Sequence, residues 1–288
     1  MSVGRTKRDR PGMGRLERKD NQPNRKPPLR LFTTTLWEYP SQHYLTWVED
    51  GKVTQTGQNV GTEHRPATQG DKHYTAATPS WVVWQLLMRY TRRNDLVVDP
   101  MCGSGTTLDV ARDLGRRAVG YDLSPTRDDI FRADARELPL EDSVADFVFV
   151  DPPYSTHVTY SDDPACIGKL DAGGADGGRA YYQAMARVIG EIDRVLKDRR
   201  YMGLYVSDSW RKKSRRGAMG GEFMPIGFEL FSMLRERFEP VDIVCVVRQN
   251  AKLKRGNWHK AAETENFFMR GFGYLFIMKK VRGARGGT

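Results

Sequence analysis

Short apolar runs and amphipathic stretches alternate along residues 77–280, and this alternation constrains the fold more than any other feature. The apolar runs are typical of buried strands and lie at 95–99, 117–122, 146–151, 201–208, 241–247 and 274–280. The amphipathic stretches have helical spacing and lie at 77–91, 106–114, 180–196 and about 226–237. This order predicts an α/β fold with a doubly wound sheet, in which ligands bind beyond the carboxyl ends of the strands.

The first predicted helix carries a start signal of its own. Thr78 is placed to cap its N-terminus, and Pro79 suits the first helical position. Residues 155–180 are rich in Gly, Asp and Ser, and we expect a mobile loop there. Phe267 and Phe268 precede the last strand and are expected to pack against the sheet.

A glycine-rich turn, "DPMCGSGTT", joins the strand at 95–99 to the next helix. Gly103 and Gly105 allow the backbone to approach a ligand closely. The turn lacks the GxxxxGK[ST] pattern of a nucleotide triphosphate site and the third glycine of a dinucleotide site. S-adenosylmethionine, which has no pyrophosphate, fits better, because Asp99 before the turn can meet its amino group. A purely structural turn remains open on this feature alone.

Further acids follow successive strands. Asp122 ends the strand at 117–122, where an acid commonly binds ribose hydroxyls. Asp134 comes after the next strand, where a carboxylate can accept from an adenine amino group. Because Asp99, Asp122 and Asp134 recur one strand apart, together they indicate a nucleoside-containing ligand.

The segment "VDPPY" places an acid, two prolines and an aromatic ring at the end of a buried strand. An exocyclic amino group on adenine or cytosine is a poor nucleophile, because its lone pair is delocalised into the ring. The Asp151 carboxylate and the Pro152 carbonyl can accept both amino hydrogens, and Pro153 helps to fix that backbone. Tyr154 offers a flat face for an extruded base.

These motifs resemble those of the class I S-adenosylmethionine-dependent amino-methyltransferases of nucleic acids. "HYTAATPSWVVWQLL", "DPMCGSGTT", "GYDLS", "RADARELPL" and "VDPPY" occur in that family's order. The resemblance covers about residues 71–280. It implies a mostly parallel, seven-stranded, Rossmann-like sheet with an antiparallel last strand. It also implies methylation of adenine N6 or cytosine N4, with DPPY commoner among adenine enzymes.

The resemblance assigns residues to a donor site and a target-base site. The predicted donor-site residues are Tyr74, Thr75, Asp99, Pro100, Met101, Cys102, Gly103, Gly105, Thr106, Thr107, Asp122, Leu123, Asp134 and Ala135. The predicted catalytic residues are Asp151, Pro152, Pro153 and Tyr154. One departure is that DNA members usually carry a distinct target-recognition region, for which this chain has little room.

Two basic clusters follow the strands at 201–208 and 241–247, so both should flank the rim that carries Asp151. Their cations and tryptophans are candidates for gripping phosphates and stacking on bases. They are Trp210, Arg211, Lys212, Lys213, Arg215 and Arg216 in the first cluster, and Lys252, Lys254, Arg255 and Trp258 in the second. Solvated basic loops are the alternative.

The formal charge of +10 is concentrated near the N-terminus. Residues 1–30 hold ten Lys or Arg and three acids, which gives +7. We predict a disordered basic tail over 1–30 that binds nucleic acid or serves solubility, and one methyltransferase domain over 31–288. The dispersed cysteines and the absence of a signal or apolar span favour a cytoplasmic protein. No metal-site spacing is present, and the oligomeric state is left open.

Several related functions compete with a DNA amino-methyltransferase. Guanine methyltransferases of tRNA also use DPPY but carry an RNA-binding domain, and glutamine methyltransferases favour Asn at position 151. Methyltransferases acting on cytosine C5 need a Pro-Cys nucleophile, and the chain has no such dipeptide. An amino-methyltransferase of structured RNA is the main alternative. A non-catalytic nucleic-acid-binding relic is disfavoured by the intact Asp151 and Tyr154.

Overall fold

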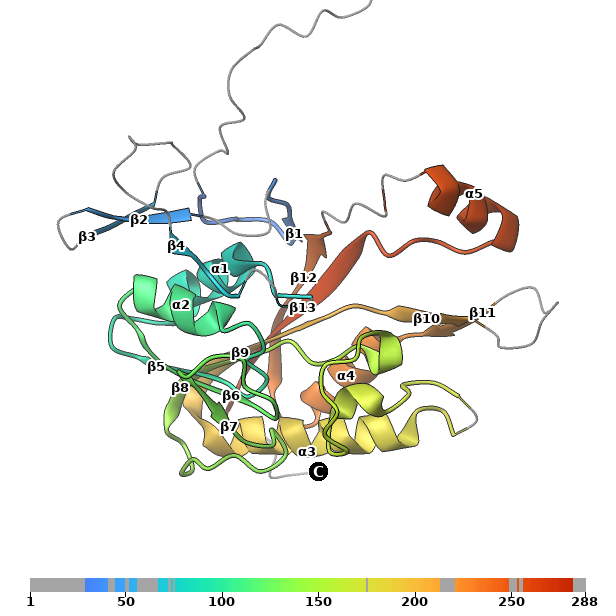
Figure 1. Ribbon diagram of the computed structural model, residues 1–288. Coiled ribbons are helices and arrows are strands. Elements are labelled where there is room, and N and C mark those ends of the chain that lie inside the picture. Colours follow the sequence, from blue (N-terminus) through green and yellow to red (C-terminus); the bar gives the residue numbers. More distant parts are fainter. Residues whose placement is uncertain are drawn as a thin grey trace, which may run out of the picture.

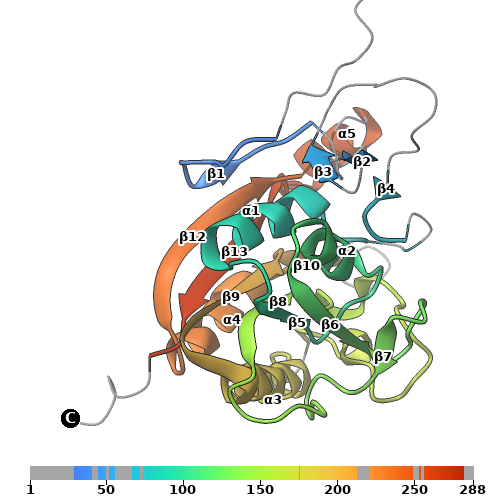
Figure 2. The same cartoon turned by 90° about the vertical axis from the view of Figure 1, so that its left-hand side faces the viewer.

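One twisted sheet forms the centre of the computed structural model, with helices on both faces (Figures 1 and 2). The structure describes residues 29–40, 45–49, 52–55, 67–71, 74, 76–174, 176–212, 221–248, 253 and 256–281. The predicted basic tail lies outside these residues, except for its last two positions. The division into a tail and one domain stays a prediction.

The main sheet has eight strands in the order β1-β12-β13-β9-β8-β5-β6-β7. Their bounds are β1 Leu36–Trp37, β5 Leu96–Asp99, β6 Arg117–Asp122, β7 Ile130–Arg132, β8 Ala145–Val150, β9 Leu196–Val206, β12 Glu239–Val247 and β13 Phe272–Lys279. All neighbouring strands are parallel except β13, which is antiparallel to both β9 and β12. The predicted α/β fold and the antiparallel last strand are therefore confirmed. The expected number of seven strands is wrong by one, because Leu36 and Trp37 add a short edge strand beside β12.

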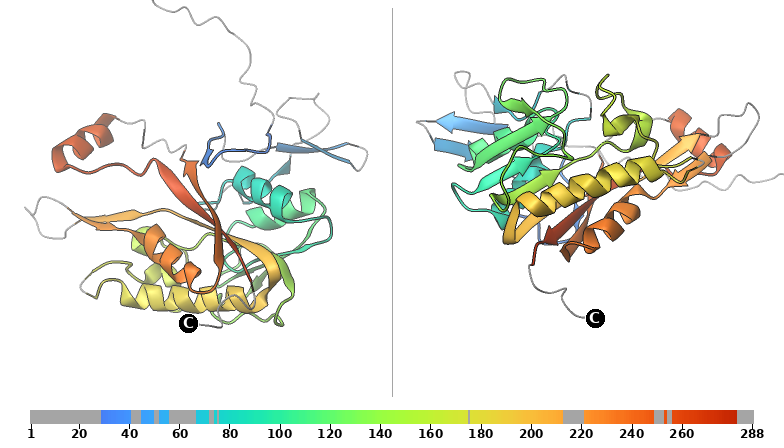
Figure 3. Two further views of the ribbon diagram at one scale, coloured as in Figure 1. Left: turned by 180° about the vertical axis from the view of Figure 1, so that it is seen from behind. Right: turned by 90° about the horizontal axis from the view of Figure 1, so that it is seen from below.

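The sequence explains why β8 lies inside the sheet. All six of its residues, "ADFVFV", are buried, as expected for a parallel strand covered on both faces. Helices α1 (Ser80–Tyr90) and α2 (Thr106–Asp113) cover one face, and α3 (Arg179–Val195) and α4 (Ile226–Arg235) cover the other (Figures 1 and 2). Figure 3 shows α3 lying across the sheet beside α4 when the molecule is seen from below. These two hydrophobic layers hold the strand ends in fixed positions.

Smaller elements surround the main sheet. A three-stranded antiparallel sheet is formed by β2 (Leu45–Glu49), β3 (Lys52–Gln55) and β4 (Ala67–Thr68). A hairpin is formed by β10 (Ser209–Lys212) and β11 (Gly221–Met224), and α5 (Gly256–Glu265) precedes β13. The sequence analysis did not identify the hairpin or α5, since it treated both basic clusters as loops.

The segment after β8 is more ordered than its composition suggests. It contains the short 3-10 helices η1 (Ser155–His157) and η2 (Ile167–Lys169), and it buries Cys166, Ile167 and Ala172. Ile167 and Ala172 pack into the same hydrophobic core as α3, so much of the segment is folded, and its mobility stays a prediction.

The start of α1 also differs from expectation. The residue before the helix is Pro79, and Thr78 does not cap it. The Thr78 hydroxyl instead donates to Asp151, 73 residues further along the chain.

Candidate active site

The carboxyl ends of the parallel strands bring the predicted acids to one edge of the sheet. Asp99 ends β5, Asp122 ends β6, and Asp151 directly follows β8. Because β12 runs in the same direction as these strands, Arg248 after its end reaches the same edge. This edge is where ligands of doubly wound folds bind.

The glycine turn between β5 and α2 has the backbone conformation that its sequence requires. Gly103 has φ +49° and Gly105 has φ +78°, both in the left-handed region that favours glycine. A Cβ atom on Gly103 would lie 2.9 Å from the ring of Tyr74. The turn is therefore closed over by Tyr74, and a larger residue at position 103 would displace that ring.

Asp99 lies behind the glycine turn rather than in an open cavity. Its carboxylate accepts a hydrogen bond from the Met101 amide (3.1 Å) and another from the Thr107 hydroxyl (2.5 Å). Burial raises the pKa of Asp99 to about 7, although both hydrogen bonds lower it. The carboxylate thus shapes the turn, and neither cavity described below is lined by Asp99.

Asp122 and Asp134 stand beside the turn with their carboxylates held by nearby donors. Asp122 accepts from the amides of Gly103 (3.0 Å) and Ser124 (2.9 Å). Asp134 accepts from the backbone amide of Arg136 (2.9 Å) and forms an ion pair with its guanidinium (2.5 Å). Both acids are fixed in orientation, which suits groups that recognise a ligand's hydroxyl or amino hydrogens.

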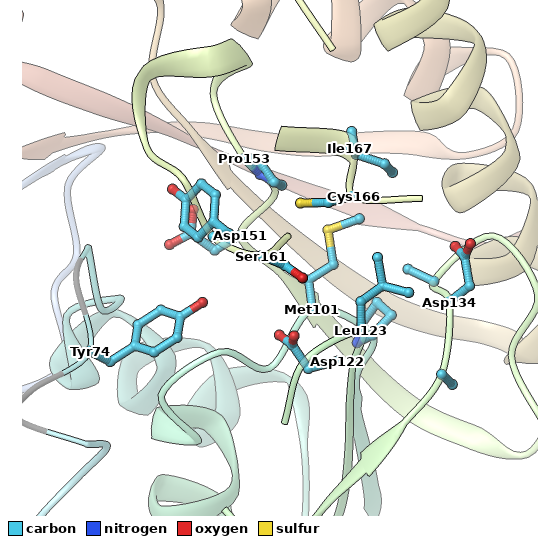
Figure 4. A pocket seen from close by; sticks show the side chains of 14 residues that line it. Tyr74, Met101, Asp122, Leu123, Asp134, Asp151, Pro153, Ser161, Cys166 and Ile167 are labelled. Atoms are coloured by element: carbon cyan, nitrogen blue, oxygen red, sulfur yellow. The ribbon is translucent and has the colours of Figure 1, made fainter. Parts of the chain in front are cut away.

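A cavity of about 570 Å³, open to solvent, lies along this edge. Figure 4 shows Tyr74 and Asp134 on opposite sides of it, with Met101 between them. Its lining residues are Tyr74, Pro100, Met101, Asp122, Leu123, Ala133, Asp134, Ala135, Asp151, Pro153, Tyr160, Ser161, Cys166 and Ile167. We call this the larger cavity. Its mixture of apolar walls with a few carboxylates is typical of a small-molecule site.

A second cavity of about 380 Å³ lies next to the first. Its lining residues are Tyr74, Ala76, Ala77, Thr78, Met101, Cys102, Gly103, Ser104, Asp151, Tyr154 and Tyr160. We call this the smaller cavity. Tyr74, Met101, Asp151 and Tyr160 line both, so the two cavities meet at these side chains.

Asp151 is held at this junction by two hydroxyl groups. Thr78 donates to one carboxylate oxygen and Tyr154 to the other, each at 2.6 Å. Burial raises the pKa of Asp151 to about 6, while both hydrogen bonds and the nearby charge of Arg248 lower it. The carboxyl is therefore ionised at neutral pH but is more basic than an ordinary aspartate.

The rest of the "DPPY" segment is fixed from below. Pro152 is buried, and the Pro153 carbonyl accepts a hydrogen bond (2.8 Å) from the hydroxyl of Tyr181 on α3. The Tyr154 ring packs against the hydrophobic core. Its hydroxyl bond to Asp151 was not anticipated from the sequence, which suggested only a stacking surface.

Most of the other predicted donor-site residues line one of the two cavities. Pro100, Met101, Leu123 and Ala135 line the larger cavity, and Cys102 lines the smaller one. Gly105, Thr106 and Thr107 line neither, because they begin α2 and are turned into the protein. Thr75 lies outside the described residues.

Three residues at the site were missed by sequence reasoning. Thr78 was read as a helix cap, and Tyr160 was hidden in a segment read as a loop. Arg248 donates to the Ser207 hydroxyl (3.2 Å), and its charge acts on Asp151 and Tyr154. Of these three residues, only Arg248 could have been identified from the sequence, because it directly follows a predicted strand.

The described part of the two basic clusters is held by contacts within the protein. The Arg211 guanidinium forms ion pairs with Asp171 and Glu222. Trp210 stacks on Phe267 with ring centroids 6.1 Å apart, and Trp258 is half-buried on α5. The strand position of Lys212 is described but its side chain is not, and Lys213, Arg215, Arg216, Lys252, Lys254 and Arg255 lie outside the described residues.

Phe268 contradicts the expectation that it packs against the sheet. Its side chain is 86% exposed, whereas Phe267 is half-buried against Trp210. The two residues lie between α5 and β13, outside any helix or strand, and Trp210 provides a stacking partner for Phe267.

Two other kinds of site are absent from the described ranges. Among those residues, no three His, Cys, Asp or Glu side chains gather in a way that would hold a metal ion. No helix in the described part of the chain has the length and apolar character needed to cross a membrane.

The part of the chain that contains the glycine turn matches a known protein family. A family model described as DNA methylase (N6/N4 methyltransferases) matches residues 8–132. Over this segment the chain is similar to DNA methylases of the N6/N4 type. The resemblance predicted from the motifs is thereby confirmed. The matched segment includes Tyr74, the glycine turn and Asp122 and ends before Asp151.

Curated relatives are similar over about a third of the chain. A type II methyltransferase of Lactococcus lactis subsp. cremoris is 31% identical over 106 residues, covering 32% of this chain and 39% of that protein. Another, from Methanothermobacter thermautotrophicus, is 28% identical over 109 residues, covering 38% of this chain and 28% of that protein. The chain therefore matches less than half the length of these relatives.

Solved structures of methyltransferases are similar at low sequence identity. An S-adenosylmethionine-dependent methyltransferase from Methanosarcina mazei has a TM-score of 0.42 and 17% identity, covering 68% of this chain and 97% of that one. A putative DNA modification methylase from Thermus thermophilus, solved with S-adenosyl-L-methionine, has a TM-score of 0.37 and 18% identity. That match covers 54% of this chain and 56% of the other.

Proposed function

We propose that the protein transfers a methyl group from S-adenosylmethionine to the exocyclic amino group of adenine or cytosine in DNA. One observation carries this proposal. The Asp151 carboxylate stands where the two cavities meet, with each of its oxygens held by a hydroxyl group. A carboxylate so placed can face a donor on one side and a target base on the other.

The larger cavity has the features that S-adenosylmethionine needs. Its acids, Asp122 and Asp134, can accept hydrogen bonds from ribose hydroxyls and an adenine amino group. Met101, Leu123 and Ile167 offer apolar surface for the adenine ring. Bound there, the donor would supply an electrophilic methyl group on a positively charged sulfur. Asp99 would act indirectly, by fixing the backbone of the turn.

Asp151 would make the amino group of the target base nucleophilic. Its carboxylate can accept one amino hydrogen, and the Pro152 carbonyl can accept the other, which localises the nitrogen lone pair. Since burial raises the pKa of Asp151 to about 6, the same carboxylate can also take up the proton that the methylated amine must lose. Thr78 and Tyr154 hold the carboxylate in one orientation for both tasks.

DNA is favoured as the substrate by the family of the relatives, and amino-methylation by the DPPY segment. A base inside a duplex must leave the stack before it can reach Asp151, at a cost of a few kcal/mol. We therefore expect single-stranded or mismatched DNA to be methylated faster than matched duplex DNA. The basic residues of both clusters are proposed to bind the phosphates.

The proposal is tested by incubating the protein with labelled S-adenosylmethionine and matched duplex DNA, single-stranded DNA or folded ribosomal RNA. Label should enter DNA, and nucleoside mass spectrometry should identify N6-methyladenine or N4-methylcytosine. Asp151→Asn should abolish incorporation while leaving the affinity for S-adenosylhomocysteine within a few-fold of the wild type. Asp142→Asn, at an exposed aspartate paired with Arg194, is the matched control and should keep full activity. Label confined to one RNA position would replace the DNA assignment, and full activity of Asp151→Asn would refute the mechanism.

A further inference from the structure

Four exposed phenylalanines gather around the start of β13. Their side chains are 43% (Phe223), 59% (Phe228), 86% (Phe268) and 42% (Phe272) exposed. Phe228 and Phe272 both contact the ring of Tyr274, with centroids 5.6 and 5.2 Å away. We call these four residues the aromatic surface. Exposed rings grouped in this way are candidates for contact with a partner.

The aromatic surface is assembled from two parts of the chain that are fixed to each other. The Arg270 guanidinium lies 5.0 Å from the centre of the Phe223 ring on β11. Trp210 on β10 stacks on Phe267, just before Phe268. The β10–β11 hairpin and the segment leading into β13 are thus held together beside α4 (Figures 1 and 3). The rings have a defined arrangement instead of being independent loop residues.

A short chain of contacts connects the aromatic surface to Asp151. Ser155, which directly follows Tyr154, donates to Asp171 (3.2 Å), and Asp171 forms an ion pair (2.8 Å) with Arg211 on the hairpin. His157 and Ser209 share a hydrogen bond at the base of the same hairpin. These contacts fix the hairpin that carries Phe223 to the segment that follows Tyr154.

A second connection runs through β13. A Cβ atom on Gly273 would lie 2.7 Å from the ring of Tyr205, so this ring packs directly against the backbone beside Phe272. The negative charge of Asp151 contributes to raising the pKa of Tyr205. Tyr205 lies on the face of the sheet that α1 covers, whereas Phe272 and Tyr274 lie on the face that α4 covers, so this contact holds the backbone of β13 and not the rings. Phe272 itself lies opposite Val247, next to Arg248, whose charge acts on Asp151, and this places the ring at the same edge of the sheet as the candidate active site.

The charge around the aromatic surface favours a polyanion as its partner. Arg270 contacts the Phe223 ring, and the Arg248 amide donates to Gly271 just before β13, while the charge of Arg248 acts on Asp151. By sequence, residues 213–220 and 249–255, which join β10 to β11 and β12 to α5, hold six Lys or Arg and no Asp or Glu. Aromatic faces interleaved with arginines bind unpaired bases through stacking, while the cations bind the phosphates.

We propose that the aromatic surface stacks on an unpaired base next to the target base in the same nucleic-acid strand. This rests on the proposed function, because the strand is held so that its target base reaches Asp151. Stacking of the neighbour keeps the strand open on that side of the target. The protein should therefore prefer substrates in which the base next to the target is unpaired. The identity of that neighbouring base should matter little, because every base has a face on which a ring can stack.

The test measures binding, without any methyl transfer. Fluorescence anisotropy gives the affinity for a labelled single-stranded oligonucleotide in the presence of S-adenosylhomocysteine. Each of the three positions on either side of the target is replaced in turn by an abasic sugar. For the wild type, an abasic sugar at one of these positions should weaken binding about fivefold to a hundredfold. The variant combining Phe268→Ala with Phe272→Ala should bind the intact strand that much more weakly and should lose nothing further at the abasic position.

The matched control is Phe131→Ala. Phe131 is also an exposed phenylalanine (58%), but it lies on β7 at the opposite edge of the sheet. The Phe131→Ala variant should bind the intact strand as tightly as the wild type does. An abasic sugar at the sensitive position should weaken its binding by the same factor as in the wild type. A second readout is a 2-aminopurine at the sensitive position, whose fluorescence should be quenched by the wild type and by Phe131→Ala but not by the double variant.

Three results would overturn the proposal. The first is an equal abasic penalty in the wild type and the double variant. The second is unchanged affinity of the double variant for the intact strand. The third is a change of sedimenting mass in the double variant with no change in oligonucleotide affinity, which would make the surface a contact between copies of the chain. Strong methylation together with any of these outcomes would leave the proposed function intact, whereas absence of nucleic-acid binding by the wild type would refute both.

Discussion

Removing the hydroxyl of Tyr154 should change the pH at which the enzyme loses activity. Tyr154→Phe keeps the aromatic ring and deletes a 2.6 Å hydrogen bond to the ionised Asp151. A hydrogen bond to a charged group contributes about 1.5–3 kcal/mol, and one pKa unit corresponds to about 1.4 kcal/mol, so the Asp151 pKa should rise by roughly one to two units. From a starting value of about 6, the acid limb of the pH profile should move to roughly pH 7–8.

The direction follows from which form of Asp151 is active. The carboxylate must be ionised to accept from the amino group, so kcat/KM falls as the pH drops through its pKa. At pH 7 the Tyr154→Phe carboxyl is about half protonated or more, so kcat/KM should fall severalfold there and recover above about pH 9. Thr78→Val should shift the limb the same way, since Thr78 donates to the other oxygen at the same distance.

The assay is kcat/KM for methyl transfer to a single-stranded oligonucleotide between pH 5 and pH 9.5. Tyr160→Phe is the control, because this tyrosine lines both cavities while the hydrogen bonds to Asp151 come from Thr78 and Tyr154. The absolute value of kcat/KM for Tyr160→Phe does not bear on the test. The acid limb of its pH profile should coincide with that of the wild type. If Tyr154→Phe loses the same factor at every pH, the hydroxyl does not act through the Asp151 pKa and the reasoning is wrong.

Three further predictions concern other parts of the chain. Gly103→Ala, whose Cβ would lie 2.9 Å from Tyr74, should weaken S-adenosylhomocysteine binding in calorimetry at least tenfold, a loss of about 1.4 kcal/mol. Gly177→Ala has a similar positive φ but open space around it, and should bind normally. Because burial raises the pKa of Asp99 to about 7 from an ordinary 3.8, its stabilising contribution is complete below about pH 4 and is lost as the pH rises through 7. In the wild type, Asp99 should lower the free energy of unfolding by about 1.4 kcal/mol for each unit that the pH rises between 5.5 and 7. Urea unfolding of Asp99→Asn at pH 5.5 and pH 7 should lack this contribution. Deleting residues 1–30 should reduce the salt dependence of duplex DNA binding, by a slope of about 0.9 per lost phosphate contact, and an unchanged slope would show that this segment makes no such contact.

The sheet and the glycine turn were predictable because their signals are local. The strands β5, β6 and β8 and the second half of β9 are short apolar runs, and the turn needs glycine at positions 103 and 105 for its positive φ values. Strand ends then place Asp122 and Asp151 at one edge without any knowledge of tertiary contacts. This is why the fold and most of the cavity lining followed from the sequence.

The contacts that organise the site were not predictable, because they join residues far apart in sequence. Nothing near Thr78 indicates that its hydroxyl binds a carboxylate 73 residues away. Helix-start statistics favoured a cap there, but the helix has no side-chain cap and the Thr78 hydroxyl donates to Asp151. Likewise, the exposure of Phe268 depends on Trp210 taking Phe267 as its stacking partner, which no local pattern encodes.

The position of β13 in the sheet has a consequence for how the chain reaches its native state. β13 lies between β9 and β12 but follows both in sequence, with Tyr274 opposite Val206. While the chain is being synthesised, β9 and β12 therefore stay apart, each with an unpaired edge, until residues 272–279 have emerged. Long unpaired edges pair readily with other chains. Refolding yield should accordingly fall with protein concentration, and any fragment ending before β13 should aggregate even though every residue of the candidate active site is present in it.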